Sequence, residues 1–351
     1  MQLEQIIANI KPLDETAMQS ARARQNMLTK PAGSLGRLES LSIQIAGITA
    51  EANPHLNHKV IVVMAGDHGV TAEGVSAYPS EVTLQMVMNF IHGGAAINVL
   101  ARHVGARVTI VDMGVASPLP ALPGLISRRI ASGTGNIAKG PAMTRAQATE
   151  SILSGVEIVE AEIAQGLDIL GTGDMGIGNT TPSAAIACAL AGFSPAEIVG
   201  RGTGVDDTGL QKKISAVERA LKVNQPDASD GLDVLAKVGG FEIGGLVGVI
   251  LGAATNRKPV MVDGFISTAA AMIAVSLAPG CRDYLIAAHC SQERGHQAML
   301  SWLELAPLID LDLRLGEGSG AALGLSLADA ACKILDEMAT FGEAGVSEKS
   351  D

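Results

Sequence analysis

Four short apolar runs in the middle of the chain each end in a glycine and an acidic residue. They read KVIVVMAGDHG, ARVTIVDMG, LDILGTGDMG and KPVMVDG. Continuous apolar runs of this length indicate strands that are buried on both faces, and the glycine marks the turn where each strand stops. A later run, YLIAAHC, indicates one more strand of the same kind.

Helical segments fill the intervals between these runs. The sequence predicts helices over 81–102, 144–165, 181–191, 208–222 and 241–255. Thr144 and Gln147 match a capping box at the start of the second of these helices. Strands that alternate with helices predict a parallel, doubly wound sheet, so the expected fold class is α/β.

The two ends of the chain have a different pattern, with helices and no strand between them. Helices are expected at 14–28, 36–50, 292–304 and 319–340. We expect these segments to pack together as a small helical domain against one end of the sheet. The expected division is a large α/β nucleotide-binding domain, 55–290, and a small helical domain that combines 1–54 with 291–351.

Each of the four apolar runs places an aspartate near its end. These are Asp67, Asp112, Asp174 and Asp263. In open parallel sheets, ligands bind beyond the carboxyl ends of the strands, where all four side chains would lie. The alternative for each aspartate is a polar residue that caps the next helix or turn.

Composition narrows the class of protein and of ligand. A chain of 351 residues that is 47% hydrophobic and 17% charged can bury a large core, either as one domain with an appendage or as two domains. Aromatic residues make up only 2%, so aliphatic side chains and methionine must form most of the core. A flat ligand would therefore meet aliphatic and thioether walls more often than aromatic ones.

The net charge of −11 argues against nucleic acid or an anionic membrane as the main partner. An anionic small molecule is still compatible with it, because a helix N-terminus or a glycine loop binds phosphate locally. The four cysteines form no CxxC pair, which favours buried reduced thiols. The N-terminus lacks the pattern of a signal peptide, and GGLVGVILGAA is too short to span a bilayer, so a cytoplasmic protein is expected.

Three polar glycine loops could approach a ligand closely. They are SGTGNIAKGPAMT (132–144), GTGDMGIGNTTPSAA (171–185) and RGTGVDDTGLQKK (201–213). The second follows a strand and opens a helix, a setting in which backbone N–H groups and the helix dipole favour an anion. Together the loops suggest a ligand of nucleotide size with a phosphate, although each alone could be an ordinary connection.

Other chemistries find little support in the motifs. Asp67 and His68 are adjacent in AGDHGV, but the other histidines form no HxH or HExxH pattern, so no metal site is expected. There is no GxSxG elbow for a serine hydrolase. The first strand is followed by MAGDHGV and not by GxGxxG, which argues against an oxidoreductase that uses a nicotinamide cofactor.

Five segments together resemble a known enzyme family over nearly the whole chain. They are KPAGSLGRLE, AGDHGV, GDMGIGNTTPSAA, DGLDVLAKVGGFEIGGLVG and RLGEGSGAAL. In this order they resemble the nicotinate-nucleotide:dimethylbenzimidazole phosphoribosyltransferases of cobalamin biosynthesis. The resemblance implies a homodimer with a Rossmann-like, mostly parallel sheet and a small helical domain built from both termini. It also implies a reaction without a cofactor, in which nicotinate mononucleotide and 5,6-dimethylbenzimidazole give α-ribazole 5′-phosphate and nicotinate.

The resemblance assigns Glu317, which stands between two glycines, as the general base. The leaving pyridinium already carries a positive charge, so its departure needs no general acid. The attacking imidazole must lose its distal N–H proton, and this step requires one base. An α product from a β substrate fits a single displacement with inversion. Asp174 is the candidate that stabilises positive charge on the ribose, although glutamate is expected at this position in relatives.

The resemblance also implies residues that bind the two substrates. Gly176, Asn179, Thr180 and Lys213 correspond to contacts with the nucleotide phosphate and ribose, Ser80, Met88 and Leu315 to walls of the benzimidazole pocket, and Ser291 to a further nucleotide contact. Three alternatives stay open: another lower-ligand base such as adenine or a phenol, cleavage of the nucleotide by water, and a non-catalytic nucleotide-binding regulatory subunit.

Overall fold

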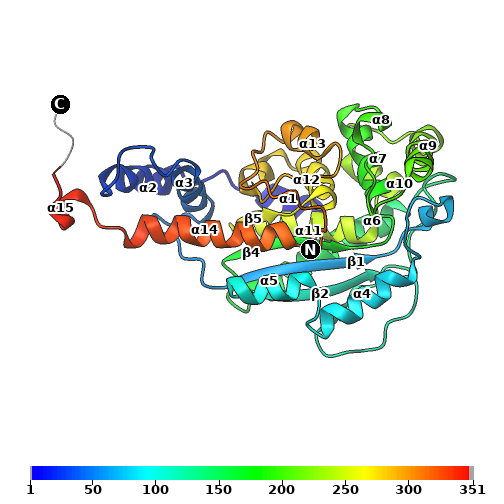
Figure 1. Cartoon of the computed structure of the whole chain (residues 1–351), viewed down its shortest axis with the longest axis horizontal. Helices are drawn as coiled ribbons and strands as arrows, with labels where there is room; N and C mark the ends of the chain where they lie inside the picture. Colours follow the sequence, from blue (N-terminus) through cyan, green and yellow to red (C-terminus); the bar gives the residue numbers. More distant parts are fainter. Residues whose placement is uncertain (1, 348–351) are drawn as a thin grey trace.

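A six-stranded sheet organises the fold in the computed structural model, which describes residues 2–347 (Figure 1). The strands are β1 (Lys59–Gly66), β2 (Ala106–Gly114), β3 (Leu125–Ser127), β4 (Ile169–Met175), β5 (Val260–Val262) and β6 (Leu285–Ala287). Every neighbouring pair is parallel, and the strand order is β3-β2-β1-β4-β5-β6. This is the order of dinucleotide-binding sheets, and it confirms the predicted α/β, Rossmann-like fold class.

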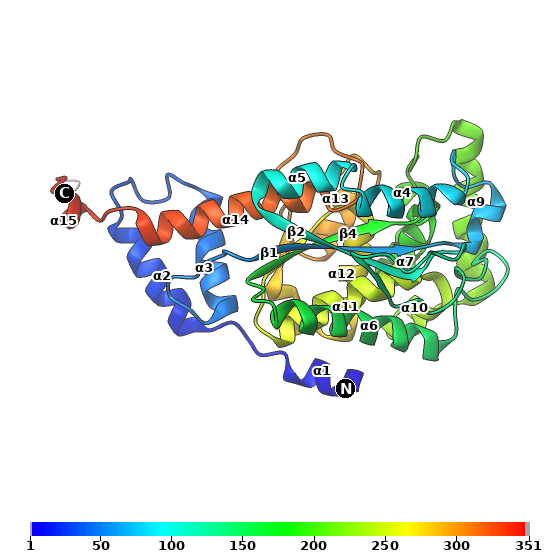
Figure 2. The ribbon, with the colours of Figure 1, turned by 90° about the horizontal axis from the view of Figure 1, so that it is seen from below.

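Two hydrophobic cores, one on each face, bury the sheet. Val60, Val62 and Met64 of β1 belong to one core, and Ile61 and Val63 belong to the other. This alternation follows from the two-residue period of a strand. The first core lies under α6 (Arg145–Ile163), α10 (Gly231–Val238), α11 (Phe241–Thr255) and α12 (Phe265–Leu277), and the second under α4 (Glu81–Ile91), α5 (Ala96–Val104) and α14 (Ser319–Glu337) (Figure 2).

Glycines allow two helices of the first core to approach closely. A Cβ atom added at Gly248 on α11 would lie 1.8 Å from the carbonyl oxygen of Ile152 on α6. A Cβ atom at Gly155 would lie 2.0 Å from the carbonyl oxygen of Gly245. Part of the high glycine content therefore serves helix packing and not ligand binding. The capping box that Thr144 and Gln147 were predicted to form at the start of α6 is confirmed.

The prediction of one helix over 81–102 is wrong, because α4 ends at Ile91 and α5 begins at Ala96. Gly93 has φ of 76°, which ends the first helix, and a Cβ atom at Gly94 would lie 2.5 Å from Asn89 Oδ1. The stretch Glu81–Val104 is the one in residues 2–347 that is long and apolar enough for a membrane span. Because a turn divides it, the stretch gives only weak support for such a span.

Several elements had no counterpart in the sequence prediction. They are α1 (Leu3–Asn9), β3, α8 (Pro195–Ile198), α10, α12 and α15 (Phe341–Ala344). Strand β3 and helix α8 are short, with three and four residues, and give little periodic signal. Helix α12 is buried along almost its whole length and is apolar on all sides, so its sequence has no helical period to read.

The terminal helices do not all pack together. α2 (Glu15–Met27), α3 (Arg37–Thr49) and the C-terminal half of α14 share a small core that includes Ala21, Ala46 and Leu335. Helix α1 instead packs on α11 and α6, and α13 (His296–Trp302) packs on α12. Segment 292–304, which was grouped with the terminal helices, thus contacts α12, and Met299 belongs to the first core. The division into two domains stays a prediction.

Candidate active site

The candidate site is a cavity of about 490 Å³ at the carboxyl ends of β4, β5 and β6. The strand order reverses between β1 and β4, and ligands of such sheets bind in the crevice at this switch point. The lining residues come from six short segments of the chain. In chain order they are Tyr78, Val82 and Met86; Asp174 to Ile177, Asn179 and Thr180; Gly202 and Thr203; Gly264 to Ile266; His289, Ser291 and Glu293; and Arg314 to Glu317.

Asp174 is the next-to-last residue of β4 and is 6% exposed. Its Oδ2 atom accepts a hydrogen bond of 2.8 Å from Asn179 Nδ2, on the loop that opens α7 (Thr180–Ala191). Burial, and then the nearby carboxylates of Asp263, Glu242 and Glu317, raise the pKa of Asp174 to about 8. Without a ligand, this carboxyl group is therefore mostly protonated at neutral pH.

Glu317 stands on a backbone turn that β4 and Asp263 hold in place. Gly316, Glu317 and Gly318 have φ of 82°, 62° and 94°, three left-handed residues in a row, which is costly for the non-glycine residue among them. The Asp263 carboxylate accepts hydrogen bonds from the backbone N–H groups of Gly318 and Ala321, at 3.2 and 2.9 Å. A Cβ atom at Gly173 would lie 2.5 Å from the carbonyl oxygen of Glu317. The turn is therefore fixed from both sides.

The Glu317 carboxylate is buried at the cavity wall, and only one of its two oxygens accepts a hydrogen bond from the described residues. Oε2 accepts a hydrogen bond of 3.2 Å from the backbone N–H of Ile97, in the first turn of α5. Oε1 accepts none from residues 2–347. Burial raises the pKa of Glu317, the Ile97 N–H opposes this shift, and the charge of Asp263 adds to it. Such a carboxylate is more basic than one in water.

The other end of the cavity is suited to a phosphate. Lys213 on α9 (Asp207–Asn224) is 1% exposed, and its Nζ donates a hydrogen bond of 2.8 Å to Thr180 Oγ1 at the start of α7. Burial lowers the pKa of Lys213 to about 8, and the charge of Glu293 opposes this. A Cβ atom at Gly202 would lie 2.7 Å from Lys213 Nζ and 2.9 Å from Thr180 Oγ1, so this loop passes close to the ammonium group, and its φ of 53° favours glycine. An anion bound here would favour the charged lysine.

A buried pair supports the floor of the site. His68 Nε2 and Glu242 Oε1 lie 2.7 Å apart, and both side chains are almost fully buried. Burial lowers the pKa of His68, but the Glu242 charge and hydrogen bond outweigh it and the net shift is upward. A Cβ atom at Gly176 would lie 3.3 Å from His68 Nε2. The pair therefore lies directly beneath the predicted nucleotide loop.

Of the four aspartates expected at the carboxyl edge, only Asp174 lines the cavity. Asp67 Oδ2 accepts a hydrogen bond from the N–H of Ala116, and Asp112 Oδ1 accepts from those of Gly114 and Val115. Asp67, Asp112 and Asp263 therefore hydrogen-bond to the backbone of turns, which agrees with the alternative interpretation of each as a capping residue. Ser291 also reaches the cavity, and its backbone N–H donates 2.8 Å to Nδ1 of His296, whose pKa burial lowers to about 3.

The structure brings most of the predicted site residues to one place. Those that line the cavity are Asp174, Gly176, Asn179, Thr180, Ser291, Leu315 and Glu317, with Lys213 directly behind Thr180. Ser80 and Met88 do not line it. Ser80, the residue before α4, donates a hydrogen bond from its Oγ to Thr71 Oγ1. Met88 lies two residues after Met86 on α4, which places it about 200° around the helix from the face that lines the cavity. Their predicted contact with the base is not supported by this geometry.

Sequence reasoning missed the residues that replace them. Val82 and Met86 line the cavity from positions four residues apart on α4, so they share one face of that helix, and Tyr78 lies in the loop before it. That spacing was present in the sequence and could have singled out Val82 and Met86. Met175, Ile177 and Phe265 add further apolar wall. The wall at this end is therefore aliphatic and thioether, with two aromatic rings.

No metal centre accompanies the cavity. Within residues 2–347, no three or more His, Cys, Asp or Glu side chains are grouped so that they could hold a metal ion. The four cysteines are free thiols. The groups present at the site are carboxylates, one buried lysine, backbone N–H groups and an apolar wall.

A parallel sheet of this order, with a phosphate-sized polar end and a buried carboxylate facing an apolar wall, defines a nucleotide-binding α/β enzyme. Comparisons with known proteins identify its family. A family model described as phosphoribosyltransferase matches residues 10–346. The chain belongs to this phosphoribosyltransferase family and is a transferase.

Curated relatives share its full length. The nicotinate-nucleotide–dimethylbenzimidazole phosphoribosyltransferase of Roseiflexus sp. (strain RS-1) is 62% identical over 347 residues, which cover 99% of this chain and 98% of that protein. The protein of the same name from Chloroflexus aggregans is 60% identical over 349 residues, 99% of each chain. A crystal structure of the enzyme of this name from Thermus thermophilus has a TM-score of 0.91 at 46% identity, over 96% of this chain and 100% of that one.

Proposed function

We propose that this chain transfers the phosphoribosyl group of nicotinate mononucleotide to 5,6-dimethylbenzimidazole, giving α-ribazole 5′-phosphate and nicotinate. The names of relatives at 54% to 62% identity support this choice of substrates. The observation in the structure that supports the mechanism is the buried Glu317 side chain, which lines the cavity and whose Oε1 accepts no hydrogen bond from other residues of the described chain.

The reaction balances with Glu317 as the single base. The azole nitrogen forms a bond to the ribose anomeric carbon, and the bond from that carbon to the pyridinium nitrogen breaks. Its electron pair neutralises the pyridine ring, and the distal N–H proton of the azole passes to Glu317. The raised pKa of Glu317 brings its basicity closer to that of the proton it receives, and a general base of this kind contributes about 10²–10⁴-fold. Attack and departure on opposite faces give inversion.

Asp174 is proposed to stabilise the ribose during this displacement. Its pKa of about 8 makes it mostly neutral in the free protein. A cationic pyridinium nucleotide would favour the ionised form, because an opposite charge a few ångströms away lowers the pKa of a carboxyl group. The carboxylate would then lie near the positive charge that develops on the ribose.

Thr180, Lys213 and Gly202 are proposed to hold the 5′-phosphate, and Asn179 to contact the ribose. Together with the α7 N-terminus, these groups offer a positive charge and donors at one end of the cavity. The aliphatic wall of Val82, Met86 and Met175 would accept a flat base by shape. This wall also favours the second candidate, transfer to another flat lower-ligand base. We further propose, from the resemblance alone, a cytoplasmic homodimer.

The test is nicotinate release from nicotinate mononucleotide, measured without a base and with 5,6-dimethylbenzimidazole, adenine or a phenol. Release that depends on 5,6-dimethylbenzimidazole supports the proposal, and competition among the bases ranks the acceptors. Release without any base would identify a hydrolase. Binding of the nucleotide with no release under any condition would favour a regulatory subunit.

A further inference from the structure

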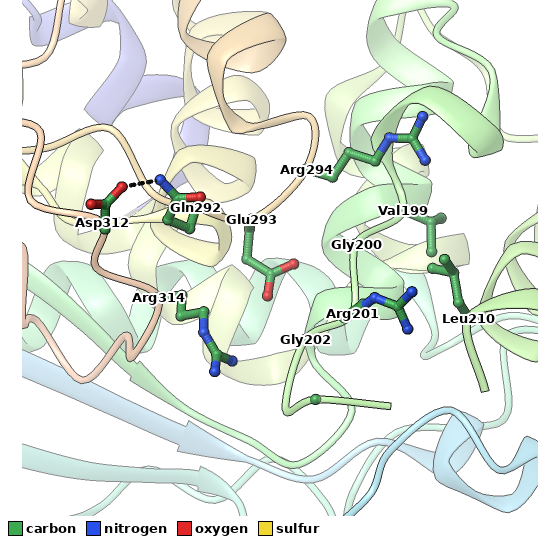
Figure 3. Close-up of a pocket in the computed structure, with 11 residues that line it drawn as sticks. Val199, Gly200, Arg201, Gly202, Leu210, Gln292, Glu293, Arg294, Asp312 and Arg314 are labelled. Carbon is green, nitrogen blue, oxygen red and sulfur yellow. Dashed lines mark hydrogen bonds between the residues drawn. The ribbon is translucent and has the colours of Figure 1, made fainter. Parts of the chain in front are cut away.

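The turn that carries Glu317 depends on supports that the proposed mechanism does not use. Segment 308–313 leads into this turn and runs beside segment 287–292, which begins at the last residue of β6. Backbone hydrogen bonds of 2.9 to 3.1 Å join the two segments. Gln292 Nε2 donates a further hydrogen bond to the Asp312 carboxylate (Figure 3). Segment 287–292 therefore fixes the chain on its way into the turn.

Asp263, the residue after β5, fixes the chain on its way out of the turn. It is 1% exposed, and its carboxylate accepts hydrogen bonds from the backbone N–H groups of Gly318 and Ala321. Its own N–H donates a hydrogen bond of 3.1 Å to Thr172 Oγ1 on β4. The carboxylate thus lies at the N-terminus of α14, where the helix dipole favours a negative charge. Asp263 therefore ties both the turn and α14 to the sheet.

His289 is a buried imidazole beside Asp263, and the proposed mechanism gives it no role. It lines the cavity, is 2% exposed, and places its Nε2 3.8 Å from Asp263 Oδ1. A Cβ atom at Gly320 would lie 2.0 Å from His289 Cδ2, so the first turn of α14 packs directly on the ring. Because His289 also belongs to segment 287–292, it links the supports on the two sides of the turn.

The other titratable groups near the turn lie on β4 and on α13. Asp174 on β4 faces Asp263 and Glu317. His296 on α13 lies against His289, with the two ring centroids 6.1 Å apart. Burial lowers the pKa of His296 to about 3, so this ring carries no charge at neutral pH. Of the two rings, only that of His289 can therefore place a charge beside Asp263.

The charge of Asp263 acts on both carboxyl groups of the active site. Burial raises the pKa of Glu317 and of Asp174, and the Asp263 charge adds to both shifts. Glu242 also faces Asp174 and acts in the same direction. Burial raises the pKa of Asp263 itself, while the His289 charge and the backbone N–H groups at the start of α14 oppose this shift. The interactions that hold Asp263 in place therefore also favour its charged form.

From these contacts we propose that Asp263 and His289 are positioning residues for the base. Asp263 fixes the turn and places a negative charge behind Glu317, and His289 keeps the Asp263 carboxylate in position. A base that is held in advance needs no rearrangement when the proton moves. A nearby negative charge also makes a carboxylate more basic. The inference rests on the proposed function, in which Glu317 accepts the azole proton.

The first test is Asp263→Asn. The amide oxygen can accept a hydrogen bond from one of the two backbone N–H groups, but the NH₂ group cannot accept from the other, and the charge is lost. We expect kcat for base-dependent nicotinate release to fall about tenfold or more, because the base is misplaced. The acid limb of kcat/KM should move to lower pH, because Glu317 and Asp174 both lose a neighbouring negative charge and ionise more easily.

Asp112→Asn is the matched control. Asp112 on β2 is 2% exposed, and its Oδ1 accepts hydrogen bonds from the backbone N–H groups of Gly114 and Val115. It holds a turn at the same edge of the sheet, but this turn does not carry Glu317. We expect urea denaturation to show a loss of stability in this variant, with kcat and the acid limb unchanged. A purely structural role of Asp263 would give the same result for both variants.

His289→Gln tests whether the imidazole acts through Asp263. We expect a smaller fall in kcat than for Asp263→Asn. The double variant should be no slower than Asp263→Asn alone, because both substitutions remove the same support. If the two effects multiplied in the double variant, His289 would act independently and its place in the pair would be refuted. Should Asp263→Asn not fold, an unchanged kcat in His289→Gln would overturn the pair.

Urea denaturation of proteins with and without Glu317→Gln measures the state of the base without any reaction. The folded-state pKa of Glu317 lies above its ordinary value of 4.5, so the folded state binds more protons and the carboxyl group lowers stability as the pH rises. The stability gap between wild type and Glu317→Gln should therefore change between pH 5 and pH 8. We expect a smaller change when Asp263→Asn is present in both proteins, because the charge behind the base is gone.

Two results would overturn the proposal. One is a fall in kcat for Asp263→Asn that is no larger than for Asp112→Asn. The other is an unchanged pH dependence in Asp263→Asn, both in the acid limb and in the stability gap. Failure of the proposed function has a different signature, which is the absence of base-dependent nicotinate release in the wild type. The denaturation series still decides in that case whether Asp263 acts on Glu317.

Discussion

The acids at the amino ends of the parallel sheet have cationic partners, whereas two buried acids at the carboxyl ends have none. At the amino ends, Lys59 of β1 pairs with Asp329 at 3.1 Å, and Arg107 of β2 pairs with Glu162 at 2.7 Å. At the carboxyl ends, Asp174 and Glu317 are buried, and within residues 2–347 no cationic side chain lies within 4.0 Å of either carboxylate. Glu162, Asp174 and Glu317 are buried and Asp329 is partly buried, but only the acids at the amino ends are paired with a cation.

The difference distinguishes charged groups that stabilise the fold from charged groups that are available to a ligand or a reaction. A buried carboxylate with a cationic partner keeps its charge and ties two elements together. One without a partner has a raised pKa and costs stability, as the value of about 8 for Asp174 shows. A chain tolerates that cost where a ligand or a reaction uses the group. The comparison therefore predicts opposite effects of substitution at the two ends.

The largest expected effect is on the rate of the Glu317→Gln variant. The amide keeps the shape and can still meet the N–H of Ile97 through its oxygen, but it cannot accept the azole proton. We expect kcat/KM for base-dependent nicotinate release to fall by about 10²–10⁴-fold. Nicotinate mononucleotide should bind with unchanged Kd in an equilibrium titration. A fall of less than threefold would mean that the base lies elsewhere, with Asp174 to be tested next.

Gly173→Ala should disturb the same carboxylate through its backbone. The new Cβ atom would lie 2.5 Å from the carbonyl oxygen of Glu317, so the turn has to move. We expect destabilisation by about 1–3 kcal/mol from overpacking and a fall in kcat of about tenfold or more from misplacement of the base. Denaturant titration and steady-state kinetics measure the two effects. Gly140→Ala, where nothing lies within 4 Å of the added Cβ, is the matched control and should be neutral.

Glu162→Gln tests the amino ends of the sheet. Glu162 is 4% exposed and accepts hydrogen bonds from Arg107 and Thr109. Removal of its charge should cost about 2 kcal/mol of unfolding free energy, below the usual range for a buried pair because the Arg107 side chain is 47% exposed. Urea denaturation measures this, and kcat/KM should not change. The exposed pair Arg282–Glu304 serves as the control, since Glu304→Gln should barely alter stability.

Asp174→Asn should give the smallest effect on stability, with a characteristic dependence on pH. The pKa of Asp174 is about 8 in the folded protein and near its ordinary 3.8 when unfolded. Between these values the folded state binds more protons, so this group lowers wild-type stability as the pH rises. The variant has no proton to lose, and its stability relative to the wild type should increase from pH 5 to pH 8 by about 1 kcal/mol or more. A constant difference across thermal melts at these pH values would refute the unpaired, buried state of Asp174.

Much of the carboxyl end could be predicted from sequence, because strand ends and glycine loops leave local signals. The runs that end in glycine and aspartate located β1, β2, β4 and β5, and the loop 171–185 gave both Asp174 and the start of α7. Lys213 was predicted as a nucleotide contact and lies at Thr180. The sequence analysis did not predict the break between α4 and α5, because the apolar pattern continues through Gly93 and Gly94, where the helix ends.

The ion pairs at the amino end and the wall residues Tyr78, Val82 and Met86 were not predicted, for different physical reasons. The pair Arg107–Glu162 joins residues 55 positions apart, and the sequence around each residue gives no sign that the two side chains meet. The wall residues Val82 and Met86 do share a face of α4, but the resemblance to the family indicated Ser80 and Met88 instead. The face of a helix that meets a cavity depends on how it packs on the sheet, and the helix itself does not encode this.

The most direct test compares Glu317→Gln and Glu162→Gln in the same two measurements, urea denaturation and kcat/KM for nicotinate release with 5,6-dimethylbenzimidazole. The account predicts a crossed result. Glu317→Gln should lose its rate and keep or gain stability, and Glu162→Gln should lose stability and keep its rate. If Glu317→Gln were destabilised with little change in rate, the unpaired carboxylate would be part of the scaffold and the account would be contradicted.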